Sequence, residues 1–189
     1  MNGEIENQLS REEQIDLLRI ARVTIRQAVQ GKKPFAYERE NKLYRQKRGA
    51  FVSLHIQSEL RGCIGYVAPI KPLLETIIEM AEAAALRDPR FNPVSRKEVE
   101  KLEIEISVLS PLTLISDTDD IIVGRHGLMI EKGHNSGLLL PQVATTYNWN
   151  RETFLDHTCL KAGLAKFAWR EKDTRIHIFT AQIFSEADL

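Results

Sequence analysis

The chain has 189 residues, of which 43% are hydrophobic and 28% are charged. These values are ordinary for globular proteins and argue against a disordered chain. Its 26 basic and 26 acidic residues give a formal net charge of zero, which excludes an overall positive field for nucleic acid or an anionic membrane but leaves a local basic patch open. The length fits one domain, or two subdomains that share a core.

Two cysteines, Cys63 and Cys159, are too few for a disulfide framework, and two free thiols inside a cell are the simpler interpretation. The first ten residues are polar and acidic, without the basic start and apolar core of a secretory signal. No run approaches the roughly 20 apolar residues of a membrane-spanning helix. We therefore expect a cytoplasmic protein that does not contact a membrane.

The first predicted element is a helix. Ser10 and Glu13 match a capping box, and apolar side chains recur with helical spacing over residues 15–29. Arg22 interrupts this apolar stripe, and Gly31 is well placed to end the helix.

The most basic segment follows at residues 32–48, where aromatic side chains alternate with positive charges. This mixture is compatible with binding phosphate or single-stranded nucleic acid. The favoured interpretation is a solvated loop whose aromatic rings pack on the protein body. The residues concerned are Lys32, Lys33, Phe35, Tyr37, Arg39, Lys42, Tyr44, Arg45, Lys47 and Arg48.

Residues 51–56 and 60–67 are predicted to form a β-hairpin, since polar and apolar side chains alternate in the first segment. In a regular strand Arg61, Cys63 and Gly65 would share one face. The glycines weaken that regularity and indicate a bulge or a close approach by another part of the chain.

The remaining segments continue the mixture of helices and strands. A helix begun by Pro69 and Pro72 is predicted to end at Asp88-Pro89, and a short helix opened by the capping box Ser95–Glu98 leads to a strand at residues 102–108. After a polar connection at 111–120, residues 128–131 and 138–140 are predicted to form a hairpin with a five-residue connection. A helix from Asn150 to Gly163 and one closing strand at 174–184 complete the chain. This order favours an α+β fold with a mostly antiparallel sheet flanked by helices.

Cys63 is the leading candidate for chemistry. A thiol beside Arg61 can have a lowered pKa, and thiol reactivity follows the thiolate content. The alternative is a small residue packed in a sheet. Arg90 is a candidate for binding an anion or carboxylate, with a structural pair to Asp88 as its alternative. His126, in a glycine-flanked turn, is the preferred histidine for a general base near Cys63.

Several other chemistries have no support in the sequence. No histidine pair has metal-ligand spacing, and no Cys-x-x-Cys motif is present. The glycine spacings match neither a dinucleotide-binding fingerprint nor a phosphate-binding loop, and Gly-x-Ser-x-Gly is absent. The sequence therefore predicts no metal site and proposes no cofactor.

The chain resembles the AMMECR domain family. The resemblance begins at Gly49–Leu54 and the run Leu60-Arg61-Gly62-Cys63-Ile64-Gly65, and it continues through Ala83–Phe91, Ile104–Pro111, Gly124–Leu128, Leu139–Val143 and Lys161–Leu164. Tyr66 and Leu86 depart from it, since the family often has threonine and an aromatic residue at these positions. Neither departure threatens the fold.

The resemblance implies one AMMECR-type domain over about residues 10–185 of the 1–189 chain. It implies two packed subdomains that share a cleft with the cysteine motif near it. The candidate ligand-binding residues there are Arg61, Gly62, Gly65, Arg90 and Gln142, with Cys63 and His126 as the catalytic candidates.

Three functions stay open. The first is an enzyme, or a catalytic component of a modification pathway, centred on Cys63. The second is a non-catalytic binding module that holds a peptide, a small ligand or a partner, since the resemblance implies an association with a Memo-type protein and a radical SAM protein. The third is nucleic-acid binding through residues 32–48, which the neutral net charge makes the weakest of the three.

Overall fold

The computed structural model describes residues 8–33 and 41–188, and Phe35, Tyr37 and Arg39 of the predicted basic segment lie outside this range. The chain divides into two compact units, which are described separately below. The first contains the described residues up to Leu109 together with those from Gln182 onward, and the second is Ser110–Ala181. Each unit has a four-stranded antiparallel sheet with helices, so the predicted α+β class is confirmed.

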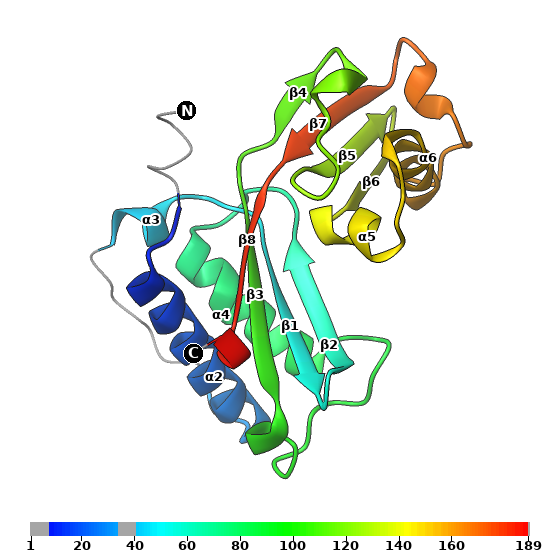
Figure 1. Ribbon diagram of the computed structural model, residues 1–189. Coiled ribbons are helices and arrows are strands. Elements are labelled where there is room, and N and C mark those ends of the chain that lie inside the picture. The colour runs from blue at the N-terminus through cyan, green and yellow to red at the C-terminus, as the bar shows by residue number, and fades with distance from the viewer. Residues whose placement is uncertain (1–7, 34–40, 189) are drawn as a thin grey trace. The chain divides into compact units, whose positions relative to one another are not determined.

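The sheet of the first unit has the strand order β2-β1-β3-β8 (Figure 1). Its strands are β1 (Ala50–Ile56), β2 (Glu59–Tyr66), β3 (Glu103–Leu109) and β8 (Ala181–Ser185). The hairpin and the strand that the sequence predicts correspond to β1, β2 and β3. Because β1 pairs with both β2 and β3, it is the central strand for the residues discussed below.

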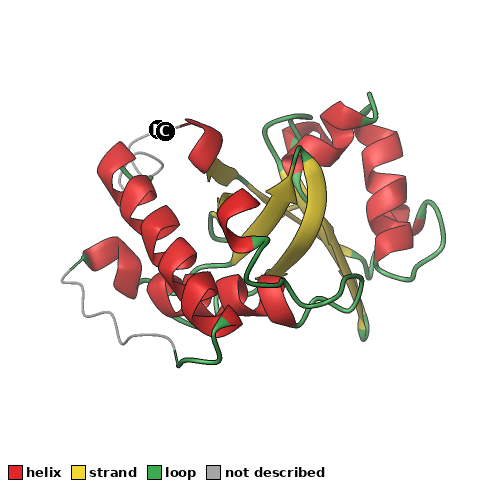
Figure 2. Cartoon of the chain, turned by 90° about the horizontal axis from the view of Figure 1, so that it is seen from below, coloured by secondary structure: helices red, strands yellow, loops and turns green. Residues whose placement is uncertain are grey.

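One face of this sheet is covered by the helices α2 (Arg11–Val29) and α4 (Leu73–Leu86), which lie side by side in both views (Figure 1; Figure 2). The strand residues on this face are apolar and fully buried: Val52, Leu54, Ile104 and Ile106. Strict alternation then directs the intervening strand residues, including Ser53, to the face without these helices. The helix-covered face therefore contains the core, and the other face can carry polar groups.

The predicted capping box of α2 is present. The Ser10 backbone N–H donates to the Glu13 carboxylate at 2.7 Å, and the Glu13 N–H donates to the Ser10 hydroxyl at 3.3 Å. The short helix α3 (Lys42–Arg45) follows within the basic segment and buries Tyr44. The Tyr44 hydroxyl donates to the carbonyl oxygen of Glu13 at 3.1 Å, which ties α3 to α2.

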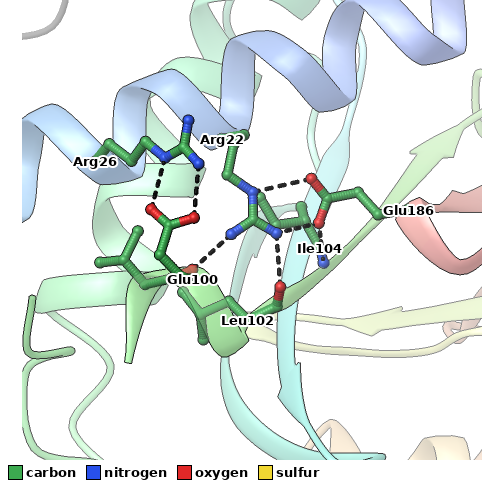
Figure 3. Close-up of polar contacts among 7 residues, drawn as sticks. Arg22, Arg26, Glu100, Leu102, Ile104 and Glu186 are labelled. Carbon is green, nitrogen blue, oxygen red and sulfur yellow. Dashed lines mark hydrogen bonds and ion pairs between the residues drawn. The ribbon is translucent and has the colours of Figure 1, made fainter. Parts of the chain in front are cut away.

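Arg22 interrupts the apolar stripe of α2 because it binds the far end of the chain (Figure 3). Its guanidinium donates at 2.6 Å to each of the carbonyl oxygens of Val99 and Leu102, and at 3.0 Å to a carboxylate oxygen of Glu186. The other Glu186 oxygen pairs with Arg22 and accepts the backbone N–H of Ile104 at 3.0 Å. The Arg22 and Glu186 side chains are only 16% and 22% exposed. This network joins α2, β3 and the one-turn helix η4 (Glu186–Asp188).

We predict that Glu186→Ala lowers the free energy of unfolding by about 2–3 kcal/mol, because it leaves a partly buried guanidinium without its counter-charge and the Ile104 amide without an acceptor. Urea unfolding measures this change. Glu100→Ala is the matched control, since Glu100 pairs with Arg26 beside the network but both side chains are exposed. An exposed pair contributes little, so equal losses in the two variants would contradict the prediction.

The sheet of the second unit has the order β4-β7-β5-β6. Its strands are β4 (Thr113–Ile115), β5 (Gly127–Lys132), β6 (Asn135–Leu139) and β7 (Arg175–Phe179). The other elements of this unit are α5 (Pro141–Thr146), α6 (Arg151–Lys161) and the one-turn helices η2 (Thr118–Asp120) and η3 (Ala168–Arg170).

The predicted helix after Asn150 is confirmed as α6. The Asn150 side chain accepts the N–H of Thr153 at 2.9 Å and so caps the helix. Phe154, Leu155 and Cys159 on α6 are fully buried in the core of this unit. Cys159 is therefore a packing residue of this core.

Two predictions about strand connections are wrong. The hairpin of β5 and β6 has a two-residue connection, Gly133-His134, because Lys132 already pairs with Asn135. The predicted closing strand is two strands, β7 and β8, which belong to different sheets. Thr180 between them exchanges hydrogen bonds of 2.8 and 2.9 Å with Ser110, at the point where the chain passes from one sheet to the other.

Other short elements also differ from the prediction. The polar connection at 111–120 contains β4 and η2, and the short helix α5, which was not predicted, begins at Pro141. The expected helix after Ser95 is a series of turns followed by the one-turn helix η1 (Val99–Lys101). The Glu98 carboxylate does accept the Ser95 backbone N–H at 2.8 Å, as in a capping box. The Ser95 hydroxyl, however, donates to the same carboxylate at 2.7 Å, and the Glu98 N–H donates to the Ser95 carbonyl at 3.0 Å, so only half of the predicted motif forms. Elements of three to six residues are too short to display a period.

Candidate functional site

The strand β2 is held at Cys63 by the segment that follows α4. The buried carboxylate of Asp88 accepts the backbone N–H of Cys63 at 2.8 Å. It also accepts the backbone N–H of Arg90 at 3.1 Å and two guanidinium N–H groups of Arg90 at 3.0 and 2.8 Å. The Nη2 group of Arg90 in turn donates to the carbonyl oxygen of Cys63 at 3.0 Å. We call this arrangement the Asp88–Arg90 clamp, because it binds both backbone polar groups of Cys63.

The clamp is a strongly coupled ion pair. The Asp88 side chain is 2% exposed, and the Arg90 hydrogen bonds hold the pKa of this carboxyl well below its usual range, against the opposing effect of burial. The Cys63 N–H acts in the same direction as Arg90. Hydrogen bonding to Asp88 raises the pKa of Arg90, and negative charge on the Cys63 thiol has the same effect to a lesser extent. Both members of the clamp therefore stay charged near neutral pH.

The Cys63 sulfur lies on the face of the sheet that α2 and α4 do not cover. Ser53 stands directly opposite Cys63 on β1, and its hydroxyl donates to Sγ at 3.2 Å. Cys63 is a free cysteine of intermediate exposure. A hydroxyl donor and an anchored guanidinium beside one residue are the groups that stabilise a thiolate.

Arg61 was expected to lie beside the Cys63 thiol, but its guanidinium pairs with Glu98 instead. Its Nε donates to the Glu98 carboxylate at 2.9 Å, and the Arg61 side chain is 16% exposed. This hydrogen bond, together with those from Ser95, lowers the pKa of Glu98 to about 2. The guanidinium carbons of Arg61 and Arg90 lie 5.9 and 5.5 Å from the centre of the Phe91 ring. Among the described residues, Arg90 is the arginine that hydrogen-bonds to Cys63.

The two glycines of the motif are explained by close packing. A Cβ atom at Gly62 would lie 2.2 Å from the carbonyl oxygen of Ala84 on α4, and one at Gly65 would lie 2.3 Å from the Phe51 ring. The predicted bulge is also present, because Leu54 pairs with Gly62 while His55 pairs with Leu60. Arg61 is therefore the extra residue of β2 in this ladder.

The other two predicted site residues belong to the second unit. His126 Nδ1 accepts the N–H of Ile122 at 3.2 Å, and the His126 N–H donates to the Ile122 carbonyl at 2.9 Å, so this residue is held in its turn. The side-chain oxygen of Gln142, in α5, is buried and has no hydrogen-bond partner among residues 8–33 and 41–188. Their roles beside Cys63 stay predictions.

Three polar residues of the site have no signal in the sequence that places them beside the cysteine motif. Ser53 and Glu98 lie on other elements than Cys63, and the sequence presents Asp88 only as a partner of Arg90. The capping-box pattern of Ser95 and Glu98 indicates a helix start and not a contact with Arg61. Within the described ranges, no group of three or more His, Cys, Asp or Glu side chains could hold a metal ion, and no helix is long and apolar enough to span a membrane.

These features define a class of protein: an α+β chain of two units, each with an antiparallel sheet, and with a clamped cysteine on the edge strand β2 of the first. The family model described as AMMECR1 matches residues 18–184, and the chain belongs to the AMMECR1 family. The resemblance seen in the sequence is thus confirmed.

The chain is similar to several archaeal proteins. It is 45% identical over 185 residues to a protein of Methanothermobacter thermautotrophicus, covering 94% of this chain and 96% of the relative. It is 43% identical over 188 residues to Protein MJ0810 of Methanocaldococcus jannaschii, covering 95% and 93%. The crystal structure of the uncharacterized protein PH0010 of Pyrococcus horikoshii matches with a TM-score of 0.83 at 42% identity, over 90% of each chain.

We predict that Asp88→Asn lowers the free energy of unfolding by about 2–3 kcal/mol at neutral pH, because a neutral amide is a poor acceptor for Arg90 and the Cys63 N–H. A lowered carboxyl pKa stabilises the fold above the ordinary value of about 4, and this contribution is lost as the pH falls below that value. The difference between wild type and variant should therefore shrink on acidification. Urea unfolding at several pH values measures it, with the exposed Asp173→Asn as control. A difference that stays constant down to about pH 2 would show that the Asp88 charge is not what stabilises the site.

Proposed function

We propose that this AMMECR1-family chain is a catalytic component of a modification pathway and that Cys63 is its reacting or substrate-holding thiol. The observation that carries the proposal is the hydrogen bond of 3.2 Å from the Ser53 hydroxyl to the Cys63 sulfur, at a residue whose backbone is fixed by the Asp88–Arg90 clamp. A thiol needs a fixed position and stabilisation of its anion to act as a nucleophile.

Arg90 gives the proposed site its substrate preference. The Arg90 side chain is 54% exposed, and its Nη1 group makes no hydrogen bond within the described part of the chain. A guanidinium with a free edge binds carboxylate or phosphate groups well. Substrates with an anionic group close to the reacting atom fit this arrangement. His126 as a base and Gln142 as a ligand group stay part of the proposal.

The cysteines favour a reducing compartment. Cys63 and Cys159 are both free, and burial raises the pKa of the Cys159 thiol, which suits an unreactive packing residue. A protein that depends on a free Cys63 needs surroundings that keep it reduced. We therefore propose a cytoplasmic location.

We predict that Cys63 in the native protein is alkylated at neutral pH and that it reacts faster with anionic iodoacetate, relative to neutral iodoacetamide, than an unstructured cysteine does. The Arg90 edge should attract the carboxylate of the reagent. Arg90→Ala should lower this rate ratio by about tenfold at low salt, equivalent to the roughly 1.4 kcal/mol expected of one such charged contact. Mass spectrometry of the Cys63 peptide measures both rates.

Arg87→Ala is the matched control for this experiment. Arg87 ends α4 one residue before Asp88, is 56% exposed and pairs with Glu82 at 3.7 Å. It should leave the rate ratio unchanged. Failure of Cys63 to react in the native wild type, with full reaction after unfolding, would refute the thiol function.

A second candidate function is a binding module. The clamp binds β2 through the backbone N–H and carbonyl of Cys63, so these hydrogen bonds would also form with another small residue at that position. This favours a recognition surface as an alternative use of the site. The partners that the family resemblance implies are a Memo-type protein and a radical SAM protein.

We predict for this second function that Cys63→Ser retains partner binding while Asp88→Asn weakens it, because only the latter removes the clamp. Copurification of the tagged chain with each candidate partner measures the effect. Absence of binding by the wild-type chain to either protein would remove this candidate. Loss of binding in Cys63→Ser would instead assign the sulfur itself to the contact.

Nucleic-acid binding through residues 32–48 stays a prediction, but fewer side chains of this segment are exposed for it than the sequence suggests. Tyr44 is 3% exposed and Arg48 is 7% exposed, and burial lowers the pKa of Arg48. Neither side chain is available for base stacking or phosphate contact in the described structure.

A further inference from the structure

The strand β2 lies at one edge of the sheet of the first unit, so one side of its backbone has no neighbouring strand (Figure 1). The Leu109 N–H donates to the carbonyl oxygen of Gly49 at 2.9 Å, in register with the ladder of β1 and β3. Because bonded and non-bonded pairs alternate in an antiparallel ladder, the odd-numbered residues of β1 bond to β3 and not to β2. Their partners on β2, Gly65 and Cys63, therefore direct N–H and C=O to the open edge.

The Asp88–Arg90 clamp occupies this edge at Cys63 and not at Gly65. Both backbone groups of Cys63 are bonded to the clamp, which agrees with the direction derived from the ladder. Gly65 is partly exposed, and on this side its N–H and C=O have no hydrogen bond to any described residue. An N–H and a C=O on a sheet edge are the groups with which an added strand pairs. The edge is thus covered at one position and open at the next outward-facing residue.

Arg90 brings a positive charge to this opening. Its Nε and Nη2 groups donate to Asp88 at 3.0 and 2.8 Å, so one side of the planar guanidinium is filled. The other side faces β2, because Nη2 also donates to the Cys63 carbonyl oxygen at 3.0 Å. Nη1 shares that side and has no acceptor among the described residues. Along β2 the carbonyl of Cys63 precedes the N–H of Gly65 on this edge, so the free part of the guanidinium lies next to the open N–H.

We propose that this edge captures the C-terminus of an extended peptide segment of a partner protein. The inference rests on the proposed use of Arg90 to bind an anionic group, and it names that group. The last peptide residue stands opposite Gly65, antiparallel to β2, and its N–H donates to the Gly65 carbonyl. One oxygen of its carboxylate accepts the Gly65 N–H, and the other accepts from Arg90.

The direction of the peptide follows from the clamp. An added strand cannot continue past Gly65 toward Cys63, because the clamp already holds the edge groups of Cys63. A peptide antiparallel to β2 therefore ends at Arg90 with its carboxylate, and a parallel peptide would begin there with its ammonium group. The guanidinium attracts the first and repels the second. An internal segment of a chain would collide with the clamp, so charge and geometry together select a C-terminus.

The test is an amide NMR titration of the isotopically labelled full chain with N-acetyl-trialanine, which carries a free C-terminal carboxylate. Its methyl side chains leave the backbone and the carboxylate as the groups that are recognised. We expect saturable shifts of the Gly65 amide and of the Arg90 Nε–H. The C-terminal amide of the same peptide is neutral there and should bind about tenfold more weakly. N-methylation of the last residue removes the N–H that donates to Gly65 and should also weaken binding.

Variants of the protein assign the contact to Arg90. Arg90→Ala should raise the dissociation constant of N-acetyl-trialanine about tenfold. Arg87→Ala is the matched control, since Arg87 is similarly exposed and pairs with Glu82, and it should bind as the wild type does. Cys63→Ser should also bind normally, because capture uses backbone groups of β2. Circular dichroism confirms that each variant is folded, and the comparison of peptide with peptide amide needs no variant.

The outcomes separate this inference from the thiol function. Equal binding of the peptide and its C-terminal amide, or no shift at Gly65, overturns the capture of a C-terminus. Sodium acetate that shifts Gly65 as strongly as the peptide reduces the site to a simple anion site and also overturns the proposal. The alkylation rates of Cys63 are measured independently of all three results. An unreactive Cys63 in a chain that binds the peptide overturns the thiol function alone and leaves this inference standing.

Discussion

The buried carboxylate of Asp88 is the interaction on which the geometry of the first unit depends. A carboxylate removed from water is stable only when donors replace its hydration, and here four N–H groups do so. Three belong to Arg90, in the segment after α4, and one belongs to the middle of β2. One charge thus fixes the end of a helix to a strand, and it does so next to the point where Gly62 lets the Ala84 carbonyl approach.

The bulge at Arg61 decides which residue of β1 stands opposite Cys63. A regular ladder continued from the pair Ile56–Glu59 would place Ser53 opposite Gly62. The extra residue shifts the register by one, so that Ser53 stands opposite Cys63 instead. The same shift directs Gly62 to the core face, where only a glycine fits. The bulge therefore both places the Cys63 thiol beside Ser53 and lets β2 pack closely on α4.

The polar groups around Cys63 fall into two kinds. Asp88 and Glu98 are committed to arginines, and their lowered pKa values keep them ionised in support of the fold. Glu105 lacks such partners within the described chain, and burial raises its pKa. Asp88 and Glu98 therefore support the fold as fixed charges, whereas the fold increases the proton affinity of Glu105.

The sequence by itself determined the family, the α+β class and the long elements, because α2, α4, α6 and the hairpin of β1 and β2 have clear periodicity or caps. It singled out Cys63 and Arg90 as candidates because they lie in distinctive local runs. It did not reveal that β7 and β8 join different sheets, since alternation records which face a residue occupies and not which strand it pairs with. Nor did it reveal Ser53 as the neighbour of Cys63, or Glu98 as the partner of Arg61. Those pairings depend on strand register and on one extra residue in β2, which only the tertiary structure decided because main-chain hydrogen bonding across strands has no local signature in the chain.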